Sequence, residues 1–382
     1  MQCGRISTII GGLVLTTMVA ACSPASGGQA DNQPPPDRVQ SLAGWHSIGL
    51  PDGMVPATLT SDHDVLFIGG SRTTGGTTSP ALAALSLDQS TAEPAPIRLT
   101  PRTPYGKVAE LTSIDAHDGT ISAVGVARGG AHSNPRWTVW TGTRHEVVDR
   151  PQTFETFGGW DAGALLGVAV DARGPLVAGT WQGPHGLDGA AWRAKGERWV
   201  RQSSSPVLQN TADRQVSPRF LESQGDGSVI MNGSVIDLTN GVHQSAVTWR
   251  DVNGSWTLTP LPDPGRRSEA WSTACTQTCW SAGFRDDKIA VWSAAGPATI
   301  PDLPAGDTDA AKLLVSADRV IIAVSEGKTG RRLIGHDGSW HVYSAPDGAV
   351  QSATMFGSRL YLVAGKGDSR TLWARDLSDV LA

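Results

Sequence analysis

The chain has 382 residues and a formal net charge of −5, so it offers no basic face of the kind that binds nucleic acid. Glycine (45), proline (24) and tryptophan (14) are abundant, apolar runs are short, and long helical periodicity is absent. This combination predicts an all-β protein. Mean domain size would divide the length into two or three units, whereas a ring of repeats can use it as one domain.

The first segment, residues 1–21, has the pattern of an export signal. Arg5 precedes an apolar stretch from residue 6 to residue 19, and the sequence then reads Val19-Ala20-Ala21-Cys22. This pattern resembles the bacterial lipoprotein signal with its lipobox, and the resemblance implies cleavage before Cys22 and a diacylglyceryl group on its sulfur. A transmembrane anchor is the alternative, but the stretch is shorter than the roughly twenty residues that a spanning helix needs.

The lipoprotein resemblance implies a place in the cell. Two or more acyl chains hold a protein stably on a bilayer, so we expect it on the extracytoplasmic face of the cell membrane. Residues 22–40 include three consecutive prolines and little to bury, which is typical of a disordered tether. A tether of this length would place the folded part roughly 25 Å from the lipid. The folded domain is predicted to span residues 41–382.

Two of the four cysteines remain in the folded part once Cys3 leaves with the signal and Cys22 carries the lipid. Cys275 and Cys279 are separated by Thr-Gln-Thr, a spacing that suits a cross-strand pair at a tight turn. Outside the cytoplasm a disulfide is the expected state. A zinc site would need two further Cys or His ligands. The local sequence has none, so we predict no metal site and no cofactor.

Two short signatures recur along the folded domain. The first is an apolar strand that ends in a small residue, at residues 67–70, 123–125, 177–179, 231–233, 281–283, 323–325 and 363–365. The second is a following strand with a large apolar anchor, at Leu85, Trp140, Trp192, Trp249, Trp292, Leu333 and Trp373. Successive anchors lie between 40 residues (Leu333 to Trp373) and 57 residues (Trp192 to Trp249) apart. This is the spacing of four-stranded propeller blades.

The two ends of the folded domain share one pattern. Trp45-His46 and Pro51-Asp52-Gly53 recur in register as Trp340-His341 and Pro346-Asp347-Gly348. Trp340 opens the outer strand of the sixth unit, whereas the seventh unit lacks such a strand. We therefore predict a seven-bladed β-propeller whose ring is closed by an N-terminal outer strand that completes the last blade and covers the free sheet edges. A β-sandwich and a ring of six or eight blades are the alternatives.

Two turns carry a family resemblance. Asn253-Gly254-Ser255-Trp256 and Asp337-Gly338-Ser339-Trp340 resemble the Asp-box turns of sialidases and related repeat propellers. The resemblance implies the propeller fold. An active sialidase would also be expected to have an arginine triad, a nucleophilic tyrosine and a paired acid. The chain has only Tyr105, Tyr343 and Tyr361, the last two within predicted strands, so the resemblance supports fold more than activity.

The candidate functional surface is the face formed by the connections from second to third strand and from blade to blade. The gap between the two signatures is 13 to 16 residues in the first four units and 8 or 9 in the last three, and the blade-to-blade connections near residues 149–163 and 202–219 are long too. Together they predict elaborated loops on one face over roughly the second to fourth blades. Aromatic, arginine and carboxylate side chains there suit sugars or anionic peptides. The candidate ligand-binding residues are His132, Arg136, Trp160, Asp161, Trp181, His185, Asp188, Arg214, Arg219 and His243. The alternative for each residue taken singly, and the one that base rates favour, is a solvated loop residue.

No catalytic signature is present. Gly327-Lys328-Thr329 lacks the first glycine of a phosphate-binding loop, and no two histidines are spaced for a helical zinc motif. The leading hypothesis is therefore a monomeric, non-catalytic binding module for an envelope glycan or protein. The alternatives are an assembly scaffold and a glycoside hydrolase with carboxylates at the propeller mouth. Its nearest candidates are Glu155, Asp161, Asp188 and Glu222.

Overall fold

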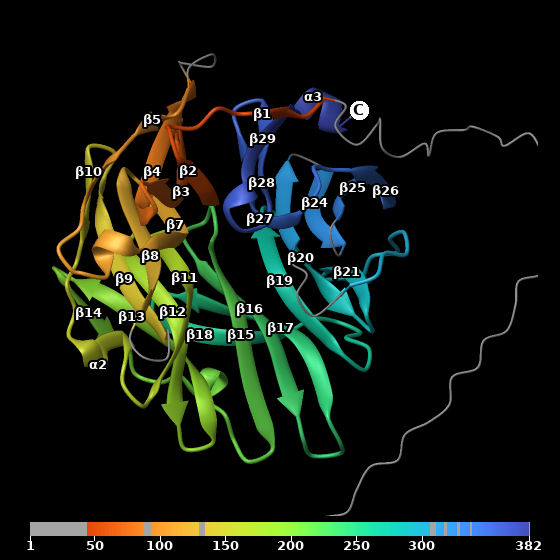
Figure 1. Ribbon diagram of the computed structural model, residues 1–382. Coiled ribbons are helices and arrows are strands. Elements are labelled where there is room, and N and C mark those ends of the chain that lie inside the picture. Colours follow the sequence, from red (N-terminus) through yellow and green to blue (C-terminus); the bar gives the residue numbers. More distant parts are fainter. Residues whose placement is uncertain are drawn as a thin grey trace, which may run out of the picture. The chain divides into compact units, whose positions relative to one another are not determined.

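The computed structural model describes residues 44–87, 93–129, 134–305, 311–316, 319–326, 329–336 and 338–381. In this part of the chain, seven sheets follow one another as the blades of a propeller (Figure 1). Six sheets have four strands and one has five. The predicted seven-bladed β-propeller is confirmed.

Each blade runs from an inner strand to an outer strand. The first three blades are β2 (Met54–Asp62), β3 (Val65–Thr74), β4 (Thr77–Ser86) and β5 (Ala95–Pro96); β7 (Glu110–His117), β8 (Thr120–Gly129), β9 (Asn134–Thr143) and β10 (Glu146–Asp149); and β11 (Ala162–Asp171), β12 (Gly174–Gly183), β13 (Gly186–Lys195) and β14 (Arg198–Arg201). A fifth strand, β6 (Arg98–Thr100), pairs in parallel with β10 and covers the outer edge of the second blade.

The remaining blades have the same order. They are β15 (Arg214–Ser223), β16 (Val229–Asp237), β17 (His243–Val252) and β18 (Ser255–Pro260); β19 (Ser268–Cys275), β20 (Cys279–Arg285), β21 (Lys288–Ser293) and β22 (Gly296–Pro297); β23 (Ala311–Ser316), β24 (Arg319–Glu326), β25 (Thr329–His336) and β26 (Ser339–Ser344); and β27 (Ala349–Phe356), β28 (Arg359–Gly365), β29 (Thr371–Asp376) and β1 (His46–Ser47). Short helices lie between or after strands: η2 (Gly106–Val108), α2 (Phe154–Phe157), η3 (Pro206–Leu208), η4 (Gly367–Ser369) and α3 (Leu377–Leu381).

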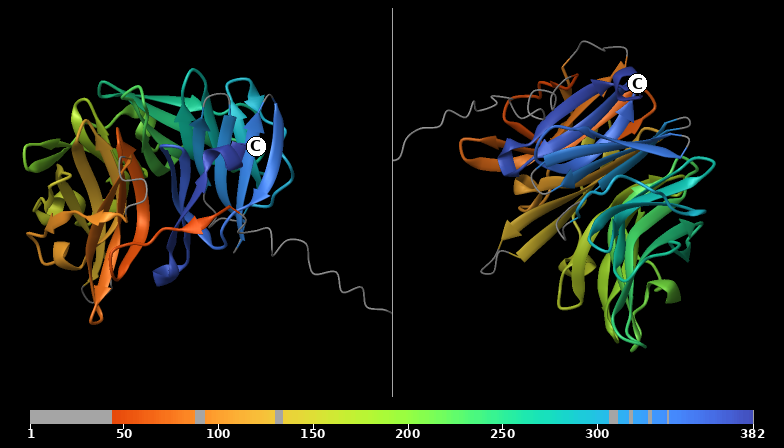
Figure 2. Two further views of the ribbon diagram at one scale, coloured as in Figure 1. Left: turned by 90° about the horizontal axis from the view of Figure 1, so that it is seen from above. Right: turned by 90° about the vertical axis from the view of Figure 1, so that its right-hand side faces the viewer.

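The N-terminal strand closes the ring. In β1, His46 pairs with Ala374 and Ser47 with Trp373 of β29, and the Ile48 N–H donates to the Leu372 carbonyl oxygen at 2.8 Å. Figures 1 and 2 both place this red-orange segment against the blue C-terminal strands. Trp45 is buried in the apolar cluster of the sixth and seventh blades. The predicted closure is confirmed.

The small residue that recurs in the second strand has a steric cause. Six of the inner strands carry a bulge; the residue opposite it in the second strand is a glycine in five blades and Ala364 in the seventh. A Cβ atom at Gly70 would lie 2.0 Å from the Val55 carbonyl oxygen, and one at Gly283 would lie 1.9 Å from that of Glu269. Larger side chains would therefore force the first and second strands apart.

The turns and the cysteine pair also follow the predictions. Asn253 (φ 55°) and Gly254 (φ 89°) form the left-handed turn between β17 and β18. Cys275 and Cys279 face each other across β19 and β20 and form a disulfide. The anchors Trp140, Trp192, Trp249 and Trp292 lie in third strands and are buried between blades.

The expected long connections between blades are present, from β10 to β11 and from β14 to β15, but the expectation of long loops between second and third strands was wrong. The additional residues lengthen the second and third strands, so that β8 and β9, or β12 and β13, are ten residues each, whereas β20 and β21 have seven and six. Between β12 and β13 the turn is only Pro184 and His185, and Gly186 (φ 123°) begins the next strand. The longer hairpins pair along their whole length, because ladder hydrogen bonds satisfy backbone groups that a loop would leave to water.

Several predicted features lie outside the described residues. These are the signal of residues 1–21, the lipidation site Cys22, the tether to residue 40 and the loop residue His132. Among the described residues, no helix is long and apolar enough to cross a membrane. The lipoprotein assignment therefore stays a prediction.

Candidate functional site

A cleft opens between the second and third blades on the face that carries the blade-to-blade connections. A cavity of about 560 Å³ is lined by the start of β9, by α2 and by the loop that leads to β11. A second cavity of about 210 Å³ shares the wall formed by Arg136 and Phe154 and reaches Tyr105. We call the residues Tyr105, Arg136, Phe154 and Trp160 the aromatic cleft.

Helix α2 positions the aromatic residues of this cleft. Phe157 is buried, and its ring centroid lies 5.6 Å from that of Trp192 and 6.4 Å from that of Trp199. This contact fixes the helix to the third blade, while Phe154 remains exposed. A Cβ atom at Gly158 would lie 2.7 Å from Cε2 of Phe154. Glycine at 158 therefore allows the Phe154 ring to lie against the backbone.

Arg136 lies among the exposed rings. Its Cζ atom is 5.9 Å from the ring centroid of Tyr105 and 5.7 Å from that of Phe154. No carboxylate of the described residues forms an ion pair with Arg136, so the N–H groups at the edge of its guanidinium remain available to an anion. Trp160 is fully exposed beside it. The cleft thus offers a cation held between two rings and an open indole face.

The structure brings two of the predicted ligand-binding residues into this cleft, Arg136 and Trp160, with Asp161 next in the chain and exposed. The other described candidates lie on strands and turns of the third and fourth blades. Asp188 is buried and accepts a hydrogen bond from the Asn210 N–H at 2.7 Å. Trp181 packs against Trp192.

The remaining candidate residues either bind other groups of the protein or are exposed to solvent. Arg214 donates to the carbonyl oxygens of Pro206 and Gln209 at 3.0 Å each, and Arg219 forms an ion pair with Glu269 at 3.4 Å. His185, in the turn between β12 and β13 of the third blade, and His243, at the start of β17, are exposed. These positions do not bring the described candidates together in one site.

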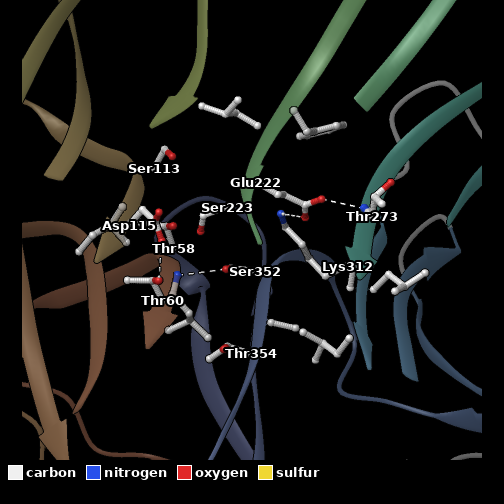
Figure 3. A pocket seen from close by; sticks show the side chains of 18 of the residues that line it. Thr58, Thr60, Ser113, Asp115, Glu222, Ser223, Thr273, Lys312, Ser352 and Thr354 are labelled. Atoms are coloured by element: carbon white, nitrogen blue, oxygen red, sulfur yellow. Dashed lines mark hydrogen bonds and ion pairs between the residues drawn. The ribbon is translucent and has the colours of Figure 1, made fainter. Parts of the chain in front are cut away.

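The second candidate site is the central channel, a cavity of about 550 Å³ walled by all seven inner strands. Its lining is rich in hydroxyl groups, and it contains Asp115, Glu222 and Lys312 (Figure 3). Figure 3 shows Asp115 beside Thr60 on one side of the cavity, and Lys312 directed toward Glu222 on another. No group of three or more described His, Cys, Asp or Glu residues could hold a metal ion.

Both carboxylates hold neighbouring blades together. Glu222 Oε2 accepts hydrogen bonds from the Thr273 N–H at 2.7 Å and from Asn232 Nδ2 at 2.8 Å, and Lys312 Nζ lies 3.1 Å from Oε1. Asp115 accepts hydrogen bonds from the Val170 N–H at 2.7 Å and from Thr60 Oγ1 at 3.0 Å. Burial raises the pKa of Asp115 to about 6, against the hydrogen bonds that lower it.

We expect Asp115→Asn to remove part of the pH dependence of stability. The pKa of Asp115 is raised from 3.8 to about 6 in the folded state. The contribution of its protonated carboxyl group to the free energy of unfolding is therefore fully present below pH 3.8 and is lost as pH rises through 6. A shift of this size corresponds to about 3 kcal/mol. Denaturant unfolding of both proteins from pH 4 to pH 8 measures the difference. A variant with an unchanged pH profile would contradict the assignment.

Comparisons with known proteins support the architecture. No protein-family model and no curated protein sequence matches the chain. Among solved structures, the polysaccharide lyase Uly1 is similar over 86% of this chain and 91% of its own, with a TM-score of 0.52 and 10% identity.

Two further structures are similar at about the same level. A Hadza microbial sialidase, Hz136, aligns over 79% of this chain and 74% of its own with a TM-score of 0.48 and 10% identity. Chaetomium thermophilum Sqt1, bound to the N-terminus of the ribosomal protein L10, aligns over 85% and 97% with a TM-score of 0.47 and 11% identity. The likeness shows the fold alone. Enzymes and binding modules share that fold.

Several residues of these sites were missed in the sequence. Phe154 and Tyr105 lie outside the repeated strands, and only the contact of Phe157 with the third blade brings them to Arg136. One signal was available, because Phe154 and Phe157 are spaced to lie on one side of a helical turn. Asp115 and Lys312 lie on inner strands, where polar residues facing the axis alternate with core residues.

Proposed function

We propose that the protein is a lipid-anchored, non-catalytic binding module at the extracytoplasmic face of the cell membrane, and that the aromatic cleft holds its ligand. The proposal rests on one observation, the position of Arg136 between Tyr105 and Phe154 beside the fully exposed Trp160. Large exposed rings grouped around an unpaired cation are unusual on a monomer, where exposed apolar patches commonly mark interaction sites.

The chemistry of the cleft favours an acidic glycan. Sugar rings present C–H faces that pack on indole and phenyl rings, and a guanidinium takes a carboxylate through two parallel hydrogen bonds. The contacts with Tyr105 and Phe154 hold Arg136 in place before the ligand arrives, which lowers the entropic cost of binding. An envelope protein with an acidic segment is the second ligand class for the same cleft.

Trp160→Ala and Arg136→Gln should each weaken binding of an acidic oligosaccharide about thirtyfold, because anchor residues of this kind contribute 2 kcal/mol or more. Isothermal titration with oligogalacturonate, and with a neutral glucan for comparison, measures the effect. Arg201→Gln is the matched control, since Arg201 also stacks on an indole, at 4.8 Å from Trp181, outside the cleft.

Two outcomes would revise the assignment. Equal affinity of the wild type and both cleft variants for the oligosaccharide would remove the cleft from the binding site. Retention of envelope proteins, with no uptake of the oligosaccharide, would shift the ligand class to protein.

A glycoside hydrolase is the second candidate, and the central channel favours it through one observation: Asp115, with its raised pKa, and Glu222, beside Lys312, line the same cavity. Such enzymes use a pair of carboxyl groups on either side of the glycosidic bond. Because both carboxylates already bind neighbouring strands, the binding module remains the preferred function. Turnover of chromogenic glycosides that is lost in Glu222→Gln would reverse this order.

A further inference from the structure

The seam between the sixth and seventh blades contains a buried cation without a counterion. Arg332, on β25, is 3% exposed, and no carboxylate of the described residues pairs with it. Its Nε and Nη1 atoms are buried and have no hydrogen-bond partner among the described residues. The Nε1 atom of Trp45, which is 7% exposed and lies in the same seam, likewise has none in this part of the chain.

The surroundings of Arg332 are aromatic and positive. Its Cζ atom lies 4.9 Å from the ring centroid of Tyr343 and 5.9 Å from that of Trp45. Burial, and then the charge of Arg375, lower the pKa of Arg332 to about 10. The rings cover the guanidinium but accept none of its in-plane N–H groups as a carboxylate would.

Such an arrangement is unfavourable without a ligand. An unpaired buried charge and buried donors without acceptors both destabilise a fold, and native proteins seldom leave either uncompensated. A neutral or apolar residue at this position would destabilise the fold less. The persistence of three orphaned N–H donors in one place therefore indicates an acceptor that carries negative charge.

We infer that this seam is an anion site for a small oxyanion, a carboxylate or phosphate group, held by Arg332 and the indole N–H of Trp45. An N–H···O contact is about 2.9 Å long, so two donors up to about 5.8 Å apart can share one oxygen. The Arg332 Cζ atom lies 5.9 Å from the Trp45 ring centroid, so the two side chains are neighbours in this seam. The site is separate from the aromatic cleft and does not depend on the proposed function.

The anion would act on ring closure. Trp45 directly precedes β1, whose two residues pair with β29 of the seventh blade, while Arg332 belongs to the sixth. An oxyanion between them would fasten the closing strand to the neighbouring blade. Because the site forms only when the ring is closed, ligand binding stabilises the folded protein in proportion to ligand concentration.

Thermal unfolding at constant ionic strength tests the site, with phosphate and acetate each titrated against chloride. The wild type should show a saturable rise in Tm of roughly 2 °C or more in at least one oxyanion. Arg332→Met should show only the non-saturating rise that excluded salts cause. Arg359→Met, which removes an arginine of β28 paired with Asp376, should behave like the wild type.

A second variant keeps the test decisive if Arg332→Met fails to fold. Trp45→Phe retains the ring and removes the N–H, and it should raise the concentration of anion at half-saturation about tenfold. A Tm without saturable dependence on either oxyanion would overturn the inference and leave ordered water as the partner of these donors. An equal response of the wild type and Trp45→Phe would exclude the indole N–H from the site.

Discussion

Trp45→Ala should destabilise the entire propeller by about 3 to 5 kcal/mol, the usual effect of removing a buried tryptophan side chain. Trp45 packs among apolar residues of the sixth and seventh blades and sets the position of β1. Its loss leaves a cavity at the seam and loosens the pairing that covers the edge of β29. Denaturant unfolding followed by tryptophan fluorescence and by circular dichroism measures the change.

The matched control is Trp160→Ala. Trp160 is fully exposed, so its removal should change the free energy of unfolding by less than about 0.5 kcal/mol. Deletion of residues 44–50, which removes β1 itself, should have a larger effect than Trp45→Ala. Unfolding of the deletion variant at the wild-type denaturant midpoint would show that the N-terminal strand does not hold the ring closed.

Asp251→Ala should be comparably harmful, because it breaks a buried ion network between the third and fourth blades. Asp251 Oδ2 lies 2.6 Å from Arg173 Nη2 and 3.2 Å from Arg193 Nη2, and both arginines also pair with Asp171. Removing one partner of a buried pair leaves an uncompensated charge and typically costs 3 to 5 kcal/mol. Equilibrium unfolding at pH 7 measures the loss.

The network also predicts an acid sensitivity. Burial alone would raise the pKa of Asp171, but hydrogen bonds from Arg193 and Arg173 outweigh it and hold the pKa below its ordinary value. The resulting stability is present above the ordinary pKa, near 4, and is lost as pH falls through the lower folded value. Asp226→Ala, which removes an exposed partner of Arg250, is the control and should cost less than about 1 kcal/mol. Equal losses for Asp226→Ala and Asp251→Ala would refute the network's role.

The blade count could be predicted from sequence because similar residues recur at equivalent positions of the blades. A glycine opposite the bulge, as at Gly283, and a large anchor in the third strand, as at Trp292, are imposed by packing within one blade. Such constraints recur at blade spacing and leave a visible pattern. The closing strand was visible for the same reason, since Trp45 and Trp340 open equivalent outer strands.

The candidate site could be predicted only in part. Arg136 and Trp160 were found through their place on the variable face, yet their association depends on Phe157 reaching Trp192 in the next blade. Spacing alone also could not distinguish a long loop from a long hairpin, because pairing along β12 and β13 is decided by neighbouring strands. Arg332 and its seam gave no sequence signal at all, since burial of an arginine follows from tertiary packing.

Crystallisation of the protein with an acidic oligosaccharide tests most directly whether the aromatic cleft is the ligand-binding site. We predict sugar density stacked on Trp160, with a carboxylate on the guanidinium edge of Arg136. Density in the central channel against Asp115 and Glu222, with an empty aromatic cleft, would contradict the proposed function and favour a hydrolase.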